Sequence, residues 1–586
     1  MNIAAVEEIQ DDPELRRAWN ELARRMEHPE VFYTYEWAVA VQRSYRSSLT
    51  PLVFLAYEGE SLLGVVAFAR ENASPRSVTF LTAATADYCD FISDPLTRPE
   101  FVDVVFSELR RQKIEKIVLA NLPADSSSVA VISASASRHR FHPIARPAYL
   151  CARVVLGSAE QRAALKRATC SKKKLRRNLR VMEEQAPVVF RHDSRWEEIE
   201  PLLPSFSKAH VARFLATGRI SNLARAARRV FLYELARELS RSGWMSLSRL
   251  LIGEIPVAWN YGFQFAGSWF WYQPTLNIAY EDLSPGFCLL SKIVEAACDL
   301  PDIDIVDLGL GAEDYKTQFA TANRQTLYIA LDRSFPGYLR AATRDHAAAL
   351  VKASPQIERR IRTWIRRIAG LRAHLQEGNF AALLSWLNRR IWGSLVAFDE
   401  VSFFEWPGEY EGPRVSKGVS LRQLDFDLLA AAAIHYADEA PTMGYLLRSA
   451  QRLRLKDGYG VALIALDGTP VHFCWVKDFE GFRMAELERN LHAPCPEAVM
   501  IFDCFTPPSA RGHGLFADAI SALADQLHSE KKAPWIFGAA TNLASLRGIQ
   551  KSGFTYRFSL GRSRILFLKR TKDSPSTNIA RSVHAP

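Results

Sequence analysis

The sequence has little cysteine and lacks the motifs that mark several large classes of protein. Its eight cysteines are scattered among 586 residues, with no Cys-x-x-Cys pair and no Cys/His cluster at zinc spacing. We therefore expect no disulfide framework, no bound metal and a reducing, cytoplasmic environment. Neither a Gly-x-Ser-x-Gly sequence nor a Walker loop occurs, which removes serine-hydrolase and P-loop nucleotide chemistry.

Long apolar runs and a basic leader are also missing. Residues 1–19 carry five acidic side chains instead of a positively charged start and an apolar core, so we expect no signal peptide. No apolar run reaches membrane-spanning length, which predicts a soluble or peripheral protein. With 48% hydrophobic and 24% charged residues, the chain is typical of globular proteins and long enough for three or four domain-sized units.

A predicted strand, glycine turn and helix follow one another near the C-terminus. The apolar run from Val499 to Phe505 predicts a buried strand, and Leu515, Ala519, Leu523 and Leu527 recur at helical spacing. The glycines between them allow a close approach to a ligand, and the free N–H groups of the first helical turn attract anions. The predicted cofactor-binding residues are Phe505, Thr506, Arg511, Gly512, His513, Gly514, Leu515 and Phe516, with Asn542 and Ser545 further along the chain.

This segment resembles the pyrophosphate loop of the GNAT acyltransferases, Arg-x-x-Gly-x-Gly/Ala. Arg511 to Gly514 match the loop, and Phe516 stands in place of the small last residue. Asn542, Ser545 and Gly553-Phe554 resemble the second signature of the family, an Asn and a small residue that open a helix. The resemblance implies acetyl-CoA, or another acyl-CoA, as co-substrate. Many members carry a catalytic Tyr seven residues after that Asn, where this chain has Ile549.

The general base is not marked by any motif. Asp503 interrupts the apolar strand just before the glycine turn, where a carboxylate could relay a proton through water; the alternative is an outward-facing strand residue. His472 and Glu486 are further candidates.

Three hairpin patterns, spaced by about a domain length, predict one fold used three times. They cover Leu52 to Ala69, Leu247 to Phe263 and Val461 to Trp475. We predict an α/β (α+β) multidomain protein with three GNAT-like mixed-sheet units, a tandem pair and a separate C-terminal domain. The predicted divisions are 1–165 and 166–335 for the tandem halves, 336–400 for a basic helical linker, 401–572 for the C-terminal domain and 573–586 for a disordered tail.

The first 335 residues resemble the CelD-type tandem-GNAT proteins of exopolysaccharide synthesis, which share their architecture with Fem-type aminoacyl transferases. Segments 87–91, 172–180, 283–290 and 307–316 carry this resemblance. It implies a substrate site, for which the candidates are Asp87, Asp90, Glu313, Tyr315 and Lys316. The alternatives are turn chemistry for the two aspartates and a solvated helix start for the others. Ser284-Pro285-Gly286 contains no Arg-x-x-Gly, but this helix start can still present N–H groups to an anion; the alternative is a structural helix capped by Ser284.

Positive charge is concentrated between Arg340 and Trp392. Eleven Lys and Arg against three acidic residues give this segment a formal +8 of the chain's +10. The pattern predicts a basic amphipathic helix that contacts an anionic membrane surface, or a connector whose apolar face packs on a domain.

Together these features predict a cytoplasmic acyl-CoA-dependent N- or O-acyltransferase, peripheral on the inner face of the membrane if the basic segment docks there. The resemblance implies a saccharide or cell-envelope precursor as the acceptor. One alternative is a Fem-like transferase that uses aminoacyl-tRNA, and another is a non-catalytic assembly module of a polysaccharide synthase.

Overall fold

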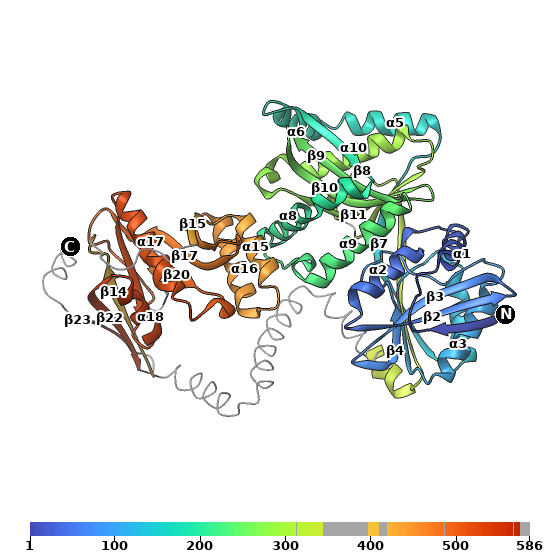
Figure 1. Cartoon of the computed structure of the whole chain (residues 1–586), viewed down its shortest axis with the longest axis horizontal. Coiled ribbons are helices and arrows are strands. Elements are labelled where there is room, and N and C mark those ends of the chain that lie inside the picture. The colour runs from blue at the N-terminus through green and yellow to red at the C-terminus, as the bar shows by residue number, and fades with distance from the viewer. Residues whose placement is uncertain are drawn as a thin grey trace. The chain divides into compact units, whose positions relative to one another are not determined.

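Large mixed sheets flanked by helices form the fold, as the sequence predicts. The computed structural model describes residues 1–311, 313–340, 342–343, 396–408, 419–485, 487–565 and 568–574. The chain divides into unit 1, residues 1–213 with 225–350, and unit 2, residues 214–224 with 351–586 (Figure 1). Most of the predicted basic linker, the predicted C-terminal tail and Glu486 lie outside the described residues. None of the described helices has both the length and the apolar character needed to cross a membrane.

Unit 1 contains a thirteen-stranded sheet with the order β1-β2-β3-β4-β6-β13-β7-β12-β11-β10-β9-β8, and β5 pairs with β3. The strands are β1 (Asn2–Val6), β2 (Leu49–Glu58), β3 (Ser61–Glu71), β4 (Ser74–Phe80), β5 (Ile92–Ser93), β6 (Lys116–Pro123), β7 (His142–Val155), β8 (Val188–Asp193), β9 (Met245–Ile252), β10 (Ile255–Phe265), β11 (Ser268–Leu276), β12 (Ile305–Leu310) and β13 (Ala322–Asp332). The helices are α1 (Pro13–Arg24), α2 (Tyr35–Tyr45), α3 (Arg98–Arg111), α4 (Ser128–Arg138), α5 (Ala159–Cys170), α6 (Lys173–Glu183), α7 (Trp196–Ile199), α8 (Leu203–Ala216), α9 (Ala226–Arg241), α10 (Pro285–Asp299) and α11 (Asp314–Thr317).

The two predicted halves of unit 1 are joined through strand β13. Although β13 follows the second half in sequence, it lies between β6 and β7, with Ile329 opposite both Leu119 and Ala145. Strand β7 in turn pairs with β13 over most of its length and with β12 of the second half near its end. The halves therefore form one continuous sheet.

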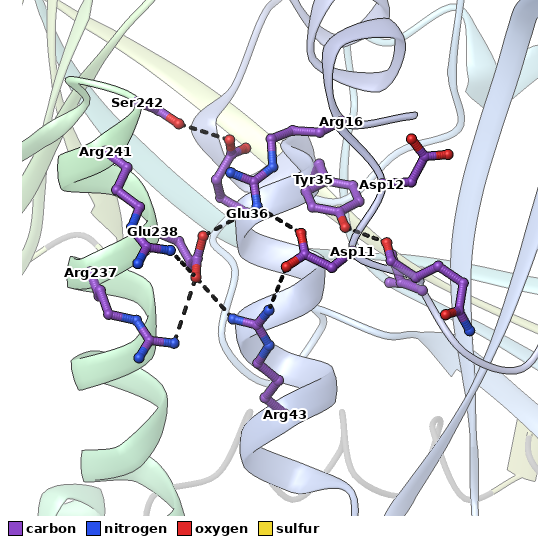
Figure 2. Close-up of polar contacts among 12 residues, drawn as sticks. Asp11, Asp12, Arg16, Tyr35, Glu36, Arg43, Arg237, Glu238, Arg241 and Ser242 are labelled. Carbon is purple, nitrogen blue, oxygen red and sulfur yellow. Dashed lines mark hydrogen bonds and ion pairs between the residues drawn. The ribbon is translucent and has the colours of Figure 1, made fainter. Parts of the chain in front are cut away.

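Helices α2 and α9 also tie the halves together through a buried carboxylate (Figure 2). Glu238 of α9 is 1% exposed and lies within 3.7 Å of four guanidinium groups, those of Arg16, Arg43, Arg237 and Arg241. Arg16 and Arg43 come from the first half. A buried carboxylate needs such partners, because desolvation of an unpaired charge costs several kcal/mol.

Unit 2 is built on an eight-stranded sheet with the order β15-β16-β17-β20-β21-β14-β22-β23. Its strands are β14 (Val396–Glu405), β15 (Val419–Gln423), β16 (Tyr459–Ala465), β17 (Pro470–Asp478), β20 (Ala498–Phe505), β21 (Ala533–Ala539), β22 (Thr555–Ile565) and β23 (Leu568–Ser574), with β18 (Arg483–Met484) and β19 (Arg489–Asn490) in a separate ladder. The described helices are α15 (Phe426–His435), α16 (Ala440–Leu455), α17 (Leu515–Ser529) and α18 (Leu543–Lys551).

Strand β14 lies between β21 and β22, which are consecutive sheet strands of the chain. The same arrangement occurs in unit 1, where β13 separates β6 from β7. All three predicted hairpins are confirmed as β2–β3, β9–β10 and β16–β17. Each turn includes a glycine with positive φ: Gly59, Gly253 and Gly468.

Candidate functional site

Strands β20 and β21 of unit 2 diverge at the end that leads to the glycine turn. Their parallel pairing runs from Ala498–Ala533 to Ile501–Ile536 and stops there. The last four residues of β20, from Phe502 to Phe505, keep only β17 as a described strand partner. Backbone groups on the β21 side of this segment are therefore available to a ligand.

Asp503 lies in a β-bulge within this diverging segment. The register between β17 and β20 shifts between Phe473 and Trp475, and Asp503 adopts a left-handed φ of 45°. Such a conformation costs an L-residue roughly 1–2 kcal/mol. Two residues of α16 compensate: Arg452 forms an ion pair with the Asp503 carboxylate, and the Tyr445 hydroxyl donates to its carbonyl oxygen at 3.0 Å. Bulges of this kind redirect backbone groups.

The glycine turn before α17 is open. Gly512 and Gly514 have φ values of 89° and 76°, and a β-carbon built on either would meet no atom within 4 Å. Among the described residues, no acceptor receives the backbone N–H groups from Gly512 to Phe516. The Arg511 side chain donates to the Thr506 carbonyl at 3.2 Å. The free N–H groups and the positive end of the α17 dipole give this turn the properties of an anion site.

The second predicted signature lies at the start of α18. Asn542 caps this helix, because its side chain accepts the backbone N–H of Ser545 at 3.1 Å. Phe516 is accommodated by Gly548 of the same helix: a β-carbon there would lie 2.5 Å from the Phe516 ring. Ile549 is fully buried in the core. Its side chain is apolar, so it offers no proton to a leaving group.

His472 of β17 lies close to the residues on either side of the glycine turn, Thr506 and Phe516. Its Nδ1 is 2.7 Å from the Thr506 hydroxyl, and its ring meets Phe516 at 5.7 Å between centroids. Burial lowers the pKa of His472 to about 3, so the ring is neutral near pH 7. Among the described residues its Nε2 has no hydrogen-bond partner. No sequence motif marks its two neighbours, Cys474 and Cys504, or the Asp503 partners Tyr445 and Arg452.

In unit 1 the structure brings three of the five predicted substrate residues together. Lys316 is buried, and its ammonium group contacts the Leu310 carbonyl at 2.9 Å and Glu313 at 2.8 Å. Asp87 is near Lys316 and Asp307; burial, and then the negative charge of Asp307, raise the pKa of Asp87 to about 7. Gly309, at φ 71°, permits this approach, because a β-carbon there would be 2.6 Å from Asp87 Oδ2.

The other two predicted residues have separate partners. The Tyr315 hydroxyl accepts from Trp271 Nε1 at 3.1 Å. Asp90 is buried and accepts from the Ser126 hydroxyl at 2.6 Å and from the Phe91 N–H at 2.7 Å, which is turn chemistry. The partners of Asp90 are therefore Ser126 and Phe91, and not the residues of the Lys316 cluster. The predicted cap at Ser284 is wrong: this residue precedes α10 at φ 49°, and its side chain makes no capping hydrogen bond.

A family model described as an acetyltransferase (GNAT) domain matches residues 171–317. This stretch of the chain is similar to GNAT domains. It comprises β8 to β12, α10 and the Glu313–Lys316 segment, and therefore falls within the second predicted half of unit 1. Asp87 of the first half approaches this stretch at Gly309.

Several solved structures resemble the chain. They include FemX, at 8% identity and a TM-score of 0.40 over 58% of this chain and 99% of that one. Another is the C-terminal domain of a putative lysylphosphatidylglycerol synthetase from Agrobacterium fabrum. It shares 11% identity with this chain, and the match has a TM-score of 0.38 and covers 58% of this chain and 96% of that one. A tandem GNAT protein from the clavulanic acid biosynthesis pathway shares 12% identity. That match has a TM-score of 0.34 and covers 56% of this chain and 98% of that one. No curated protein matches the chain.

Proposed function

We propose that the protein is an acyl-CoA-dependent acyltransferase, with acetyl-CoA as the first donor to test, and that unit 2 binds the donor. The supporting observation is the open turn at Gly512 and Gly514, whose N–H groups have no acceptor among the described residues. A diphosphate would satisfy them, since charge-assisted hydrogen bonds from backbone amides are short and strong. Arg511 would add a positive charge beside the turn.

The diverging strands would orient the reacting thioester. An acceptor amine or hydroxyl attacks the thioester carbonyl, the CoA thiolate leaves, and one proton is transferred from acceptor to thiolate. Backbone N–H groups on the unpaired side of Phe502–Phe505 would stabilise the negative charge on the carbonyl oxygen. Asp503 is the proposed proton relay. Arg452 holds its carboxylate in place through an ion pair.

We further propose an acceptor that is a saccharide or cell-envelope precursor, on the resemblance of residues 1–335 to CelD-type proteins. The Asp87, Glu313 and Lys316 cluster of unit 1 offers carboxylates and an ammonium group to a polar ligand. An acceptor screen with labelled acetyl-CoA tests this assignment. Labelled product with a saccharide would support it, and transfer only to peptides or lipids would contradict it.

Calorimetric titration of the full chain with acetyl-CoA tests the donor site. Saturable binding should weaken at least about tenfold in Gly514→Asp, which places a negative charge where the diphosphate would lie; tenfold corresponds to about 1.4 kcal/mol. Gly468→Asp is the matched control. Gly468 also has a positive φ, 83°, and open surroundings, but it lies in the β16–β17 turn.

Two results would contradict the proposal. Equal binding by wild type and Gly514→Asp would show that the turn is not the donor site. No binding of acetyl-CoA at millimolar concentration would favour the non-catalytic assembly module, or the aminoacyl-tRNA alternative if the chain then shifts charged tRNA in a gel.

A further inference from the structure

Two cysteines and a histidine of unit 2 meet on the face of the sheet that α17 covers. Their ligand atoms, one each from His472, Cys474 and Cys504, all lie within 4.8 Å of one another. His472 and Cys474 are two residues apart on β17, so their side chains share a face. Cys504 comes from β20, immediately after the bulge at Asp503. Both cysteines are free thiols.

The histidine is held as a metal ligand would be. Its Nδ1 is 2.7 Å from the Thr506 hydroxyl, while its buried Nε2 has no hydrogen-bond partner among the described residues. A buried polar atom without a partner is costly and uncommon. Histidines that ligate metals generally use the other ring nitrogen in a hydrogen bond, which fixes the ring and its tautomer.

We propose that His472, Cys474 and Cys504 form a binding site for a thiophilic cation, of which Zn²⁺ is the representative. Tetrahedral zinc with Zn–S of about 2.3 Å and Zn–N of about 2.0 Å holds its ligand atoms about 3.5–3.8 Å apart. The present cluster is within about 1 Å of that spacing. Binding converts the two thiols to thiolates and releases two protons to solvent.

The chemistry of the three donors favours zinc over hard cations. Thiolate and imidazole ligands select zinc and similar metals, whereas magnesium and calcium require oxygen ligands. Cys504 is half-buried, so an ion can enter from its side. Three protein ligands leave a fourth coordination position for a water molecule or another small ligand. The site uses none of the N–H groups at Gly512 and Gly514, but Cys504 lies in the Phe502–Phe505 segment that would orient the thioester.

The full-length protein, reduced and freed of metal, is titrated with Zn²⁺ alone against a chromogenic chelator. We expect one zinc per chain, and we expect Co²⁺ to give the intense absorption of a tetrahedral thiolate complex. Cys504→Ser should weaken zinc binding at least about 100-fold, and Thr506→Val about tenfold, the lower range for loss of a partner that orients a ligand. Cys495→Ser is the control, because this half-buried thiol of unit 2 lies outside the cluster.

Gly514→Asp should retain zinc, so failure of the zinc site and failure of the donor turn are distinguishable. The proposal is wrong if the reduced wild type binds no stoichiometric zinc. It is also wrong if Cys504→Ser binds as tightly as wild type. Circular dichroism is used to check that each variant is folded. Cys504 is chosen for substitution because it is half-buried, so a change there should disturb the fold less than a change at buried Cys474.

Discussion

At the scale of single residues, unit 1 contains carboxylates in two contrasting environments. Asp87 has a carboxylate neighbour, Asp307, and its pKa is raised to about 7. Glu238 instead is surrounded by four guanidinium groups. The first residue should therefore affect how stability changes with pH, and the second should affect stability itself.

The stability of unit 1 should depend on the protonation of Asp87. Its folded pKa of about 7 exceeds the ordinary value of 3.8, so the folded state binds more protons between these values. The free energy of unfolding should consequently fall as pH rises from about 4 to about 7, by at most about 4 kcal/mol, and level off above that. Asp87→Asn should flatten this part of the profile, which urea unfolding at a series of pH values measures. An unchanged slope in the variant would refute the assignment.

Replacing Glu238 by Gln should destabilise unit 1 by about 3 kcal/mol, because three half-buried arginines and the exposed Arg241 lose the buried carboxylate that they share. Hydrogen exchange should accelerate in α2 and α9, the helices that Glu238 joins. Glu198→Gln is the comparison: it breaks the exposed pair with Arg195, and a much smaller loss is expected, because solvent screens an exposed ion pair. Similar losses of stability in both variants would mean that the ion pairs of buried Glu238 stabilise the fold no more than an exposed ion pair does.

At the scale of elements, the inserted strands are the part of the fold that the sequence does not indicate. The β2–β3, β9–β10 and β16–β17 hairpins could be predicted because their turns and alternation are local. The place of β13 could not, since its partners Leu119 and Ala145 are about 200 residues away along the chain. The same holds for β14 in unit 2.

The candidate sites show the same limit. The turn from Arg511 to Gly514 is readable because it is contiguous, and the structure shows it open. The proposed zinc site at His472, Cys474 and Cys504 departs from the expectation of no bound metal, and Cys504 is 30 residues from Cys474 along the chain. Only the β17–β20 register and the bulge at Asp503 bring Cys504 to the other two. Short metal-binding motifs in a sequence do not show how two distant strands pair, so they could not indicate this site.

Proline in β13 should damage unit 1 far more than proline in an edge strand. Ile329→Pro removes a backbone donor from a strand that is paired on both sides, at a cost above about 3 kcal/mol. The controls are Ala4→Pro and Ala5→Pro in the edge strand β1. Successive N–H groups point to opposite sides of a strand, so at least one of these two substitutions should be mild. Urea unfolding compares the three variants, and equal losses would contradict a central role for β13.

At the scale of the whole molecule, charge is the property that the sequence describes most clearly. The segment from Arg340 to Trp392 carries +8 of the formal +10, and nearly all of it lies outside the described residues. Its contact with an anionic membrane stays a prediction.

Liposome flotation tests that prediction on the full chain. Vesicles containing anionic lipid should capture the protein, and neutral vesicles should not, because each basic residue near the surface contributes about 1 kcal/mol. Replacing the five arginines at positions 359, 360, 362, 366 and 367 by glutamine should release it. Raising the salt concentration should have the same effect. Equal capture by neutral vesicles would contradict an electrostatic contact.

The shared sheet of unit 1 also has a consequence for synthesis on the ribosome. Strand β6 pairs with β4 on one side and with β13 on the other, so the second side stays unpaired until β13 is translated. Strand β7, the last of the first half, ends at Val155, whereas β13 ends only at Asp332. At roughly 5–20 residues per second, the nascent chain waits roughly 10–35 seconds between these points. During that interval an open strand flank is available to other newly made chains, so chaperone protection matters most before the last strand emerges.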